Sequence, residues 1–115
     1  MLEHMKLNDG KNKEEKKKLA IYYSNRAAIH LKMENYGLAI NDADCAIDVD
    51  SEYAKSYYRK ADGYIAIDKY KEAKECLKIV VIKMKIKDKD AIDKYNFVNK
   101  VIKERAFLEA IHNEE

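Results

Sequence analysis

The sequence predicts an all-α protein made of stacked helical hairpins, and three observations lead to that class. The chain of 115 residues contains no proline and only three glycines, so few residues would interrupt a helix. Apolar residues make up 47% of the chain, which is enough material for the core of one small domain. Residues 20–50 also align with residues 54–84 at a constant offset of 34 positions. Each copy is expected to be one structural unit that stacks on its neighbour.

The two copies of the repeat agree in residue type as well as in apolar pattern. Small and aromatic residues recur in the pairs Tyr23 and Tyr57, Ala27 and Ala61, His30 and Tyr64, Tyr36 and Tyr70, Ala39 and Ala73, and Ile47 and Val81. Small residues let two antiparallel helices approach closely, and aromatic rings fill the space around them. In period and residue pattern the chain resembles the tetratricopeptide-repeat family, which implies an α-α superhelix.

The apolar periodicity predicts five helices, at residues 12–33, 36–49, 52–67, 70–83 and 88–111. Asn12 and Glu15 are expected to form a capping box that starts the first helix, and Asn35 is expected to cap the second. Short turns at residues 34–35 and 68–69 would close the two hairpins. The long last helix is expected to cap the stack through an apolar stripe formed by Ala91, Tyr95, Val98, Ile102 and Leu108.

These elements divide the chain into three parts. The first part, residues 1–11, is expected to combine an expression scar, Met1 to Met5, with a flexible basic and polar lead. The repeat domain follows, with its repeats at about 20–53 and 54–87, its capping helix at about 88–111, and total bounds of 12–111. Residues 112–115 form a tail.

The segment before the first repeat is too polar to supply a packed helix. Residues 6–18 contain almost no apolar side chains, whereas stable arrays usually stack three or more repeats. We therefore expect a piece of a longer array in which the first helix lacks its neighbour. Its uncovered apolar surface predicts self-association through the first helix.

The composition excludes several functions. The net charge is +2, with lysines and acids interspersed, which disfavours nucleic-acid binding. Cys45 and Cys76 are far apart and have no partners at metal spacing, so we expect no metal, no disulfide, and a cytoplasmic or nuclear setting. No apolar run is long enough to span a membrane. No catalytic or phosphate-binding motif occurs, so no enzymatic activity and no cofactor are expected in this segment.

Polar residues at the sixth position of each repeat predict a binding groove. These residues are Asn25 and Arg59, and Lys55 lies one helical turn before Arg59. Parallel stacking would line them along one concave surface without an acid among them, a set of donors that suits a carboxylate. An ordinary solvated helix face is the alternative interpretation of Lys55 and Arg59.

The same three residues resemble the dicarboxylate clamp of tetratricopeptide co-chaperones. That resemblance implies that Asn25, Lys55 and Arg59 bind the acidic C-terminal tail of heat-shock chaperones of the ninety- and seventy-kilodalton classes. In that family the preceding repeat adds a further lysine and asparagine, and this sequence has no counterpart for either. The resemblance therefore implies weak binding by this segment alone.

Segments throughout the chain are similar to the repeat domain of type-5 serine/threonine protein phosphatases. They are Tyr22 to Arg26, Lys55 to Lys60, Lys87 to Ala91, and the pattern from Lys94 to Ile111. The resemblance implies a parent chain with a metal-dependent phosphatase domain beyond Glu115, inhibited by its own repeat domain. Glu34 stands where that family places an inhibitory glutamate; a plain turn residue is the alternative.

Other sources of the same fold stay open. A non-enzymatic co-chaperone or an immunophilin would carry such a domain, and so would a scaffold with no carboxylate clamp. Among other polar residues, His30 is expected to pack in the core rather than to act in catalysis. The aspartates of the second helix are expected to be surface acids, because no glycine stands where a calcium loop needs one; they are Asp42, Asp44, Asp48 and Asp50.

Overall fold

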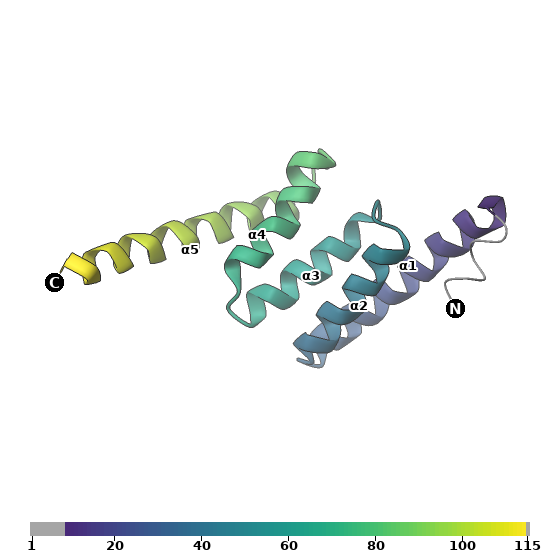
Figure 1. Ribbon diagram of the computed structural model, residues 1–115, viewed down its shortest axis with the longest axis horizontal. Coiled ribbons are helices and arrows are strands. Elements are labelled where there is room, and N and C mark those ends of the chain that lie inside the picture. The colour runs from purple at the N-terminus through teal and green to yellow at the C-terminus, as the bar shows by residue number, and fades with distance from the viewer. Residues whose placement is uncertain (1–8, 115) are drawn as a thin grey trace.

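The computed structural model describes residues 9–114, and within this part of the chain the protein is entirely helical (Figure 1). The helices are α1 (Asp9–Lys32), α2 (Tyr36–Val49), α3 (Ala54–Ala66), α4 (Tyr70–Lys78) and α5 (Lys89–Glu114). A π-helical turn, η2 (Ile79–Lys83), continues α4 without a break. The all-α prediction is confirmed. The predicted expression scar and most of the polar lead lie outside the described residues.

The helices pack as two hairpins followed by a capping helix. Consecutive helices contact one another along the whole chain, and α1 also contacts α3 directly. The first helices of the two hairpins therefore lie side by side, which is the arrangement of a repeat solenoid. The molecule measures 62 × 29 × 23 Å, because stacking extends it in one direction and α5 projects at one end (Figure 1).

The small residues that recur in the two hairpins are fully buried alanines. Ala27 and Ala39 in the first hairpin, and Ala61 and Ala73 in the second, all have no exposed surface. Because an alanine side chain is a single methyl group, the backbones of paired helices can come together at these points. The predicted role of the small repeated residues is confirmed.

The two hairpins turn in the same way. Glu34 has φ 62° and Asp68 has φ 68°, both in the left-handed region. After Glu34 the N–H of Asn35 donates to the carbonyl of His30 at 2.8 Å; after Asp68 the N–H of Lys69 donates to that of Tyr64, also at 2.8 Å. These are Schellman motifs, which satisfy carbonyls at the end of a helix. They lie 34 residues apart and confirm both predicted turns.

The two predicted N-caps, Asn12 and Asn35, do not cap their helices as expected. The first helix begins at Asp9, so Asn12 lies inside α1 and cannot start it; its lysine- and glutamate-rich surroundings favour helix. Asn35 does occupy the N-cap position of α2, but its side chain makes no capping hydrogen bond. Its backbone carbonyl instead accepts from the N–H of Ala39 at 3.0 Å. Only the position of the second cap was therefore predicted correctly.

Two further boundaries differ from prediction for local reasons. The third helix begins at Ala54 rather than at residue 52, because the N–H of Glu52 donates to the Asp50 carboxylate at 3.0 Å and holds a turn. The fourth helix changes to π-helical geometry at a run of four β-branched residues, 79–82, where the N–H of Met84 donates to the carbonyl of Ile79 at 2.8 Å.

The capping helix is covered by the body over only half its length. Ala91 and Val98 are buried against the second hairpin, and Tyr95 and Ile102 are half-buried. Leu108 is 63% exposed, so its predicted place in the packed stripe is wrong. Every described residue from Lys103 onward is exposed, because α5 extends past the body at this point (Figure 1).

Candidate peptide-binding site

The three predicted clamp residues come from the two adjacent helices α1 and α3. Asn25 is exposed on α1, Lys55 is exposed near the start of α3, and Arg59 is half-buried one turn later. Lys55 and Arg59 share a helical face because they are four residues apart. The repeat offset makes Asn25 and Arg59 equivalent positions on helices in direct contact. Convergence of the three side chains on one ligand stays a prediction.

The two cations of this set, Lys55 and Arg59, are not paired with an acid within the described part of the chain. The described hydrogen bonds and ion pairs of other side chains leave Asn25, Lys55 and Arg59 without a side-chain partner. The Nε atom of Arg59 is buried and has no acceptor. A buried N–H without an acceptor costs free energy, so a ligand that brings a hydrogen-bond acceptor to this guanidinium would be bound favourably.

Neighbouring cations differ because they are paired with acids of the fold. On α3, Lys60 Nζ lies 2.7 Å from Asp44 Oδ1. Burial lowers the pKa of Lys60, but the hydrogen bond and charge of Asp44 outweigh burial and raise it overall. From α5, Lys94 Nζ lies 2.8 Å from Asp62 Oδ1. Lys55 and Arg59 are therefore cations of the same region that remain available to an external anion.

An ion pair that was not predicted holds α1 against α2. The Arg26 guanidinium binds both carboxylate oxygens of Asp42, at 2.7 and 2.8 Å, and also donates to the Tyr22 hydroxyl at 3.0 Å. Asp42 is only 6% exposed, so its prediction as a surface acid is wrong. No periodic pattern reveals this pair, since the partners are 16 residues apart on different helices. It is a structural contact of the first hairpin.

His30 lies beside the same pair. Its Nε2 atom is 3.6 Å from Asp42 Oδ2, and its Nδ1 atom is buried without a partner. The side chain is half-buried, in line with its predicted packing role. The described neighbour of His30 is the Asp42 carboxylate, and no catalytic role is assigned to this histidine.

Glu34 occupies a position that the fold itself explains. It is exposed and forms the left-handed residue of the turn between α1 and α2. A turn position with an exposed carboxylate is compatible with an ordinary turn residue and with contact to a second domain. The predicted interdomain contact stays a prediction.

The apolar face predicted to be uncovered on α1 is present. Its large exposed side chains are Ile21, Tyr22, Ile29 and Met33, with exposed fractions from 37% to 61%. In the solenoid, the second helix of one hairpin contacts the first helix of the next, as α2 contacts α3. No described helix does this for α1. Self-association through this face stays a prediction.

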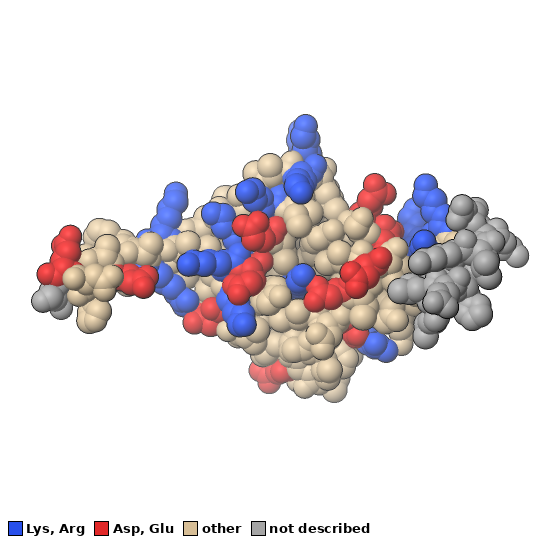
Figure 2. Space-filling model, in the orientation of Figure 1, with Lys and Arg blue, Asp and Glu red and all other residues tan. Residues whose placement is uncertain are grey.

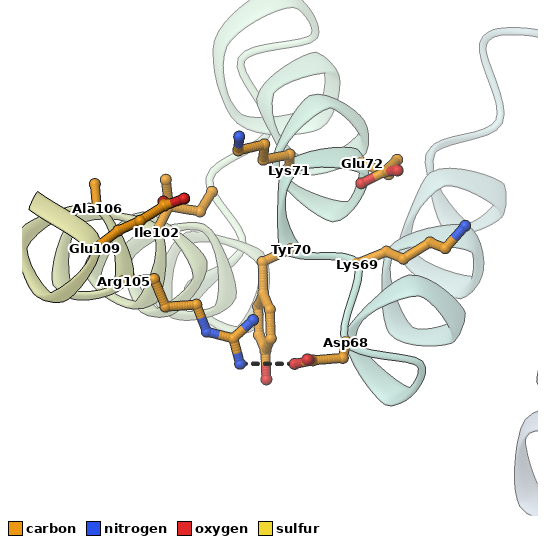
Figure 3. Close-up of a pocket in the computed structure, with 9 residues that line it drawn as sticks. All are labelled: Asp68, Lys69, Tyr70, Lys71, Glu72, Ile102, Arg105, Ala106 and Glu109. Atoms are coloured by element: carbon orange, nitrogen blue, oxygen red, sulfur yellow. Dashed lines mark hydrogen bonds and ion pairs between the residues drawn. The ribbon is translucent and has the colours of Figure 1, made fainter. Parts of the chain in front are cut away.

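A concave feature lies where α5 leaves the body (Figure 3). It is a cavity of about 260 Å³ between the α3–α4 turn and α5. Arg105 Nη2 lies 2.7 Å from Asp68 Oδ1, and the guanidinium carbon is 4.7 Å from the centre of the Tyr70 ring. Its lining mixes lysines with acids, including Lys71 and Glu109, so it favours neither charge. No pattern in the sequence indicates this contact.

Two predicted absences concern metals and membranes. Across residues 9–114 no group of three or more histidines, cysteines or acids is arranged to hold a metal ion. None of the helices in this range is long and apolar enough to cross a membrane. Cys45 is exposed and Cys76 is buried, and both are free thiols.

Comparison with known proteins identifies relatives, although no family model matches the chain. Human (Homo sapiens) serine/threonine-protein phosphatase 5 is 45% identical over 96 residues, which is 84% of this chain and 19% of the phosphatase. The Hsp70/Hsp90 co-chaperone cns1 of Schizosaccharomyces pombe is 47% identical over 57 residues, 50% of this chain and 16% of the co-chaperone. The chain thus spans about a fifth of the length of these relatives.

The solved structures support the same assignment of the fold. The Hsp90 co-chaperone Cns1 from Saccharomyces cerevisiae superposes with a TM-score of 0.71 at 24% identity, over 80% of this chain and 30% of that one. At this level of identity the likeness shows the fold alone. Together with the hairpin stacking and the sequence relatives, it identifies this chain as a tetratricopeptide-repeat module, homologous to a part of phosphatase 5 and to a part of the Hsp70/Hsp90 co-chaperone cns1.

Proposed function

We propose that this module binds the acidic C-terminal tail of heat-shock chaperones of the ninety- and seventy-kilodalton classes. The binding surface would be formed by Asn25, Lys55 and Arg59. The observation that carries the proposal is the contrast on and around α3. There, Lys60 and Lys94 are paired with acids of the fold, whereas Lys55 and Arg59 are not. Relatives named as Hsp70/Hsp90 and Hsp90 co-chaperones support this class of partner.

The chemistry of the three side chains suits a chain-terminal carboxylate. A guanidinium can donate two parallel hydrogen bonds to one carboxylate, and an ammonium adds a compact positive charge. The Asn25 amide can donate to a carboxylate and also accept from a peptide N–H. Arg59 would orient the ligand, Lys55 would neutralise a second carboxylate, and Asn25 would hold the backbone near the chain end.

The binding should be weak for this segment alone. The related clamp has two more donors on a preceding repeat, and each charge-assisted hydrogen bond contributes about 1.5–3 kcal/mol. Loss of two such contacts would bring a micromolar complex of about 8 kcal/mol close to the limit of detection. The experiment should therefore use the complete repeat domain of the parent chain alongside this segment.

A peptide titration tests the assignment. Calorimetry would compare an acidic C-terminal peptide having a free carboxyl end with the same peptide carrying a C-terminal amide. We expect tighter binding of the free carboxyl form, and a loss of roughly tenfold or more with Arg59→Ala. Lys78→Ala on α4 is the matched control, since Lys78 is an exposed lysine on another helix. Equal affinities for wild type and Arg59→Ala would refute the site.

The parent chain is proposed to be a metal-dependent serine/threonine phosphatase that acts in the cytoplasm or nucleus. In support, the phosphatase match covers 84% of the chain, against 50% for the co-chaperone match. The module would inhibit its own catalytic domain through Glu34, and chaperone tails would release it. Basal phosphatase activity of the full-length protein should rise with Glu34→Ala; unchanged activity would exclude this contact.

A further inference from the structure

The outer face of α5 carries a second apolar stripe that is largely exposed; at its start, Phe97 makes an edge-to-face contact with Tyr70 of the body, with 6.1 Å between the ring centres. The body packs against Ala91, Val98 and Ile102. On other sides of the helix four large apolar residues are exposed: Phe97 by 49%, Phe107 by 65%, Leu108 by 63% and Ile111 by 43%. Isolated exposed apolar residues are ordinary, but a set along one projecting helix marks an interaction surface.

The stripe has the spacing of a helix-pairing seam. Its positions are separated alternately by four and three residues, as in a heptad repeat: Phe97, Val101, Glu104, Leu108 and Ile111. Four of the five are apolar, and Phe107 flanks the seam. We call these five residues the α5 seam. A seam with this spacing fits a second helix laid along it, rather than a loop or a small molecule.

We infer that the α5 seam pairs with the α5 seam of a second copy in antiparallel orientation. The polar member of the seam selects this arrangement. In a parallel pair the two Glu104 carboxylates would face each other, and like charges in a seam are destabilising. In an antiparallel pair with Phe97 opposite Leu108, Glu104 lies opposite Val101 and beside Lys100 of the second copy. Each Glu104 carboxylate then lies near the ammonium group of Lys100 in the other copy.

The position of the seam permits this pairing without a collision of the bodies. From Lys103 onward every described residue of α5 is exposed, and the helix projects from the body (Figure 1). Figure 2 shows uncharged side chains between the few charged ones along this projecting end. In this register residues 103–111 of each copy lie along residues 94–102 of the other, on the side away from the buried Ala91 and Val98, and the two bodies lie at opposite ends of the pair.

The available area predicts a weak, reversible dimer. With about 150–250 Å² per large side chain, the exposed parts of Phe97, Phe107, Leu108 and Ile111 amount to roughly 400 Å² per copy. Two copies would bury about 800 Å² from these side chains, to which the stems of Lys100 and Glu104 add. Specific interfaces begin at about 1,200 Å² in total, so this association should be weak and should depend on protein concentration.

Sedimentation equilibrium over a concentration series, under reducing conditions, tests the pairing. The wild-type chain should approach twice its monomer mass as concentration rises. Leu108→Lys places a charge in the seam and should leave a monomer at every concentration. Leu38→Lys, at an exposed position of α2 outside both apolar faces, is the matched control and should dimerise like wild type. A monomeric wild type, or a dimer that persists in Leu108→Lys, would overturn the proposal.

A charge exchange tests the orientation. Glu104→Lys and Lys100→Glu should each weaken the dimer at least several-fold, because each puts like charges side by side across the antiparallel pair. The double variant should restore dimerisation. Failure of the double variant to recover would rule out the antiparallel register. None of these residues belongs to the proposed clamp, so peptide affinity should be unchanged, and circular dichroism would verify that each variant is helical.

Discussion

Arg105 on α5 and Asp68 in the α3–α4 turn are joined by a 2.7 Å ion pair, and Tyr70 lies under the same guanidinium at 4.7 Å. Figure 3 shows this contact, which joins α5 to the body in the part of the helix where every described residue is exposed. It lies where the turn presents its left-handed residue, so the geometry of the second hairpin helps to determine the direction of the projecting arm.

Arg105→Ala should make the projecting end of α5, residues 103–114, more mobile without unfolding the rest of the domain. Exposed ion pairs contribute little to global stability, so the melting temperature should change little. The amides of the distal half of α5 should exchange with solvent faster, as measured by hydrogen–deuterium exchange, because the ion pair joins this half of the helix to the body. Lys89→Ala, which removes an exposed pair with Asp93 inside the helix, is the control. Equal exchange in the two variants would contradict the anchoring role.

Gly63 and Gly37 form a natural pair for testing the packing of the hairpins. A Cβ atom on Gly63 would lie 2.7 Å from Cγ1 of the buried Ile40, whereas one on Gly37 would meet nothing within 4 Å. Gly63→Ala should lower the free energy of unfolding by about 1 kcal/mol, because overpacking outweighs the gain in helix propensity. Gly37→Ala should raise it by roughly 0.5–1 kcal/mol. Urea denaturation would measure both, and the same sign for the two would contradict the packing described.

The Asp42 carboxylate should matter more to stability than the other acids of α2. It is 6% exposed and accepts two hydrogen bonds from Arg26. Asp42→Asn removes the charge and one of the two acceptors, so the melting temperature should fall. Asp48→Asn, at an exposed position of the same helix, should leave it nearly unchanged. Thermal denaturation followed by circular dichroism compares them; similar melting temperatures would argue against the ion pair.

The two thiols should differ in reactivity and in their effect on stability. Burial raises the pKa of Cys76 to about 11, whereas Cys45 is exposed. Cys45 should react quickly with a disulfide reagent near pH 8, and Cys76 only as the protein unfolds. The unfolded chain releases the Cys76 proton at a lower pH than the native chain, so stability should fall as the pH rises from about 9 to 11. Cys76→Ala should reduce this loss, and an identical pH dependence would refute it.

The order of the elements could be predicted because the same residue types recur in both repeats at a fixed offset. Ala27 and Ala61, or Tyr36 and Tyr70, recur at one offset, and small residues that recur in this way are typical of helix crossings. The bounds of α2 agree with the prediction at both ends. The turn positions were also predictable, since both hairpins use the same motif.

The features that escaped prediction depend on contacts between distant residues. Burial of Asp42 follows from Arg26 on the neighbouring helix, and nothing in the local sequence of α2 indicates it. Leu108 fits an apolar stripe by periodicity, but its exposure depends on where the body ends. For the clamp, the residue types could be predicted from the repeat register, whereas the pairing of the neighbouring Lys60 and Lys94 with acids depends on contacts between helices.

Chemical-shift mapping would locate the bound peptide on the protein. An acidic C-terminal peptide would be titrated into the isotope-labelled complete repeat domain, and backbone amide shifts would be followed residue by residue. We predict that the largest shifts cluster on α1 and α3 around Asn25, Lys55 and Arg59, and that they vanish when the peptide ends in an amide. Shifts confined to α4 and α5, or unchanged by the amide, would contradict the proposed clamp.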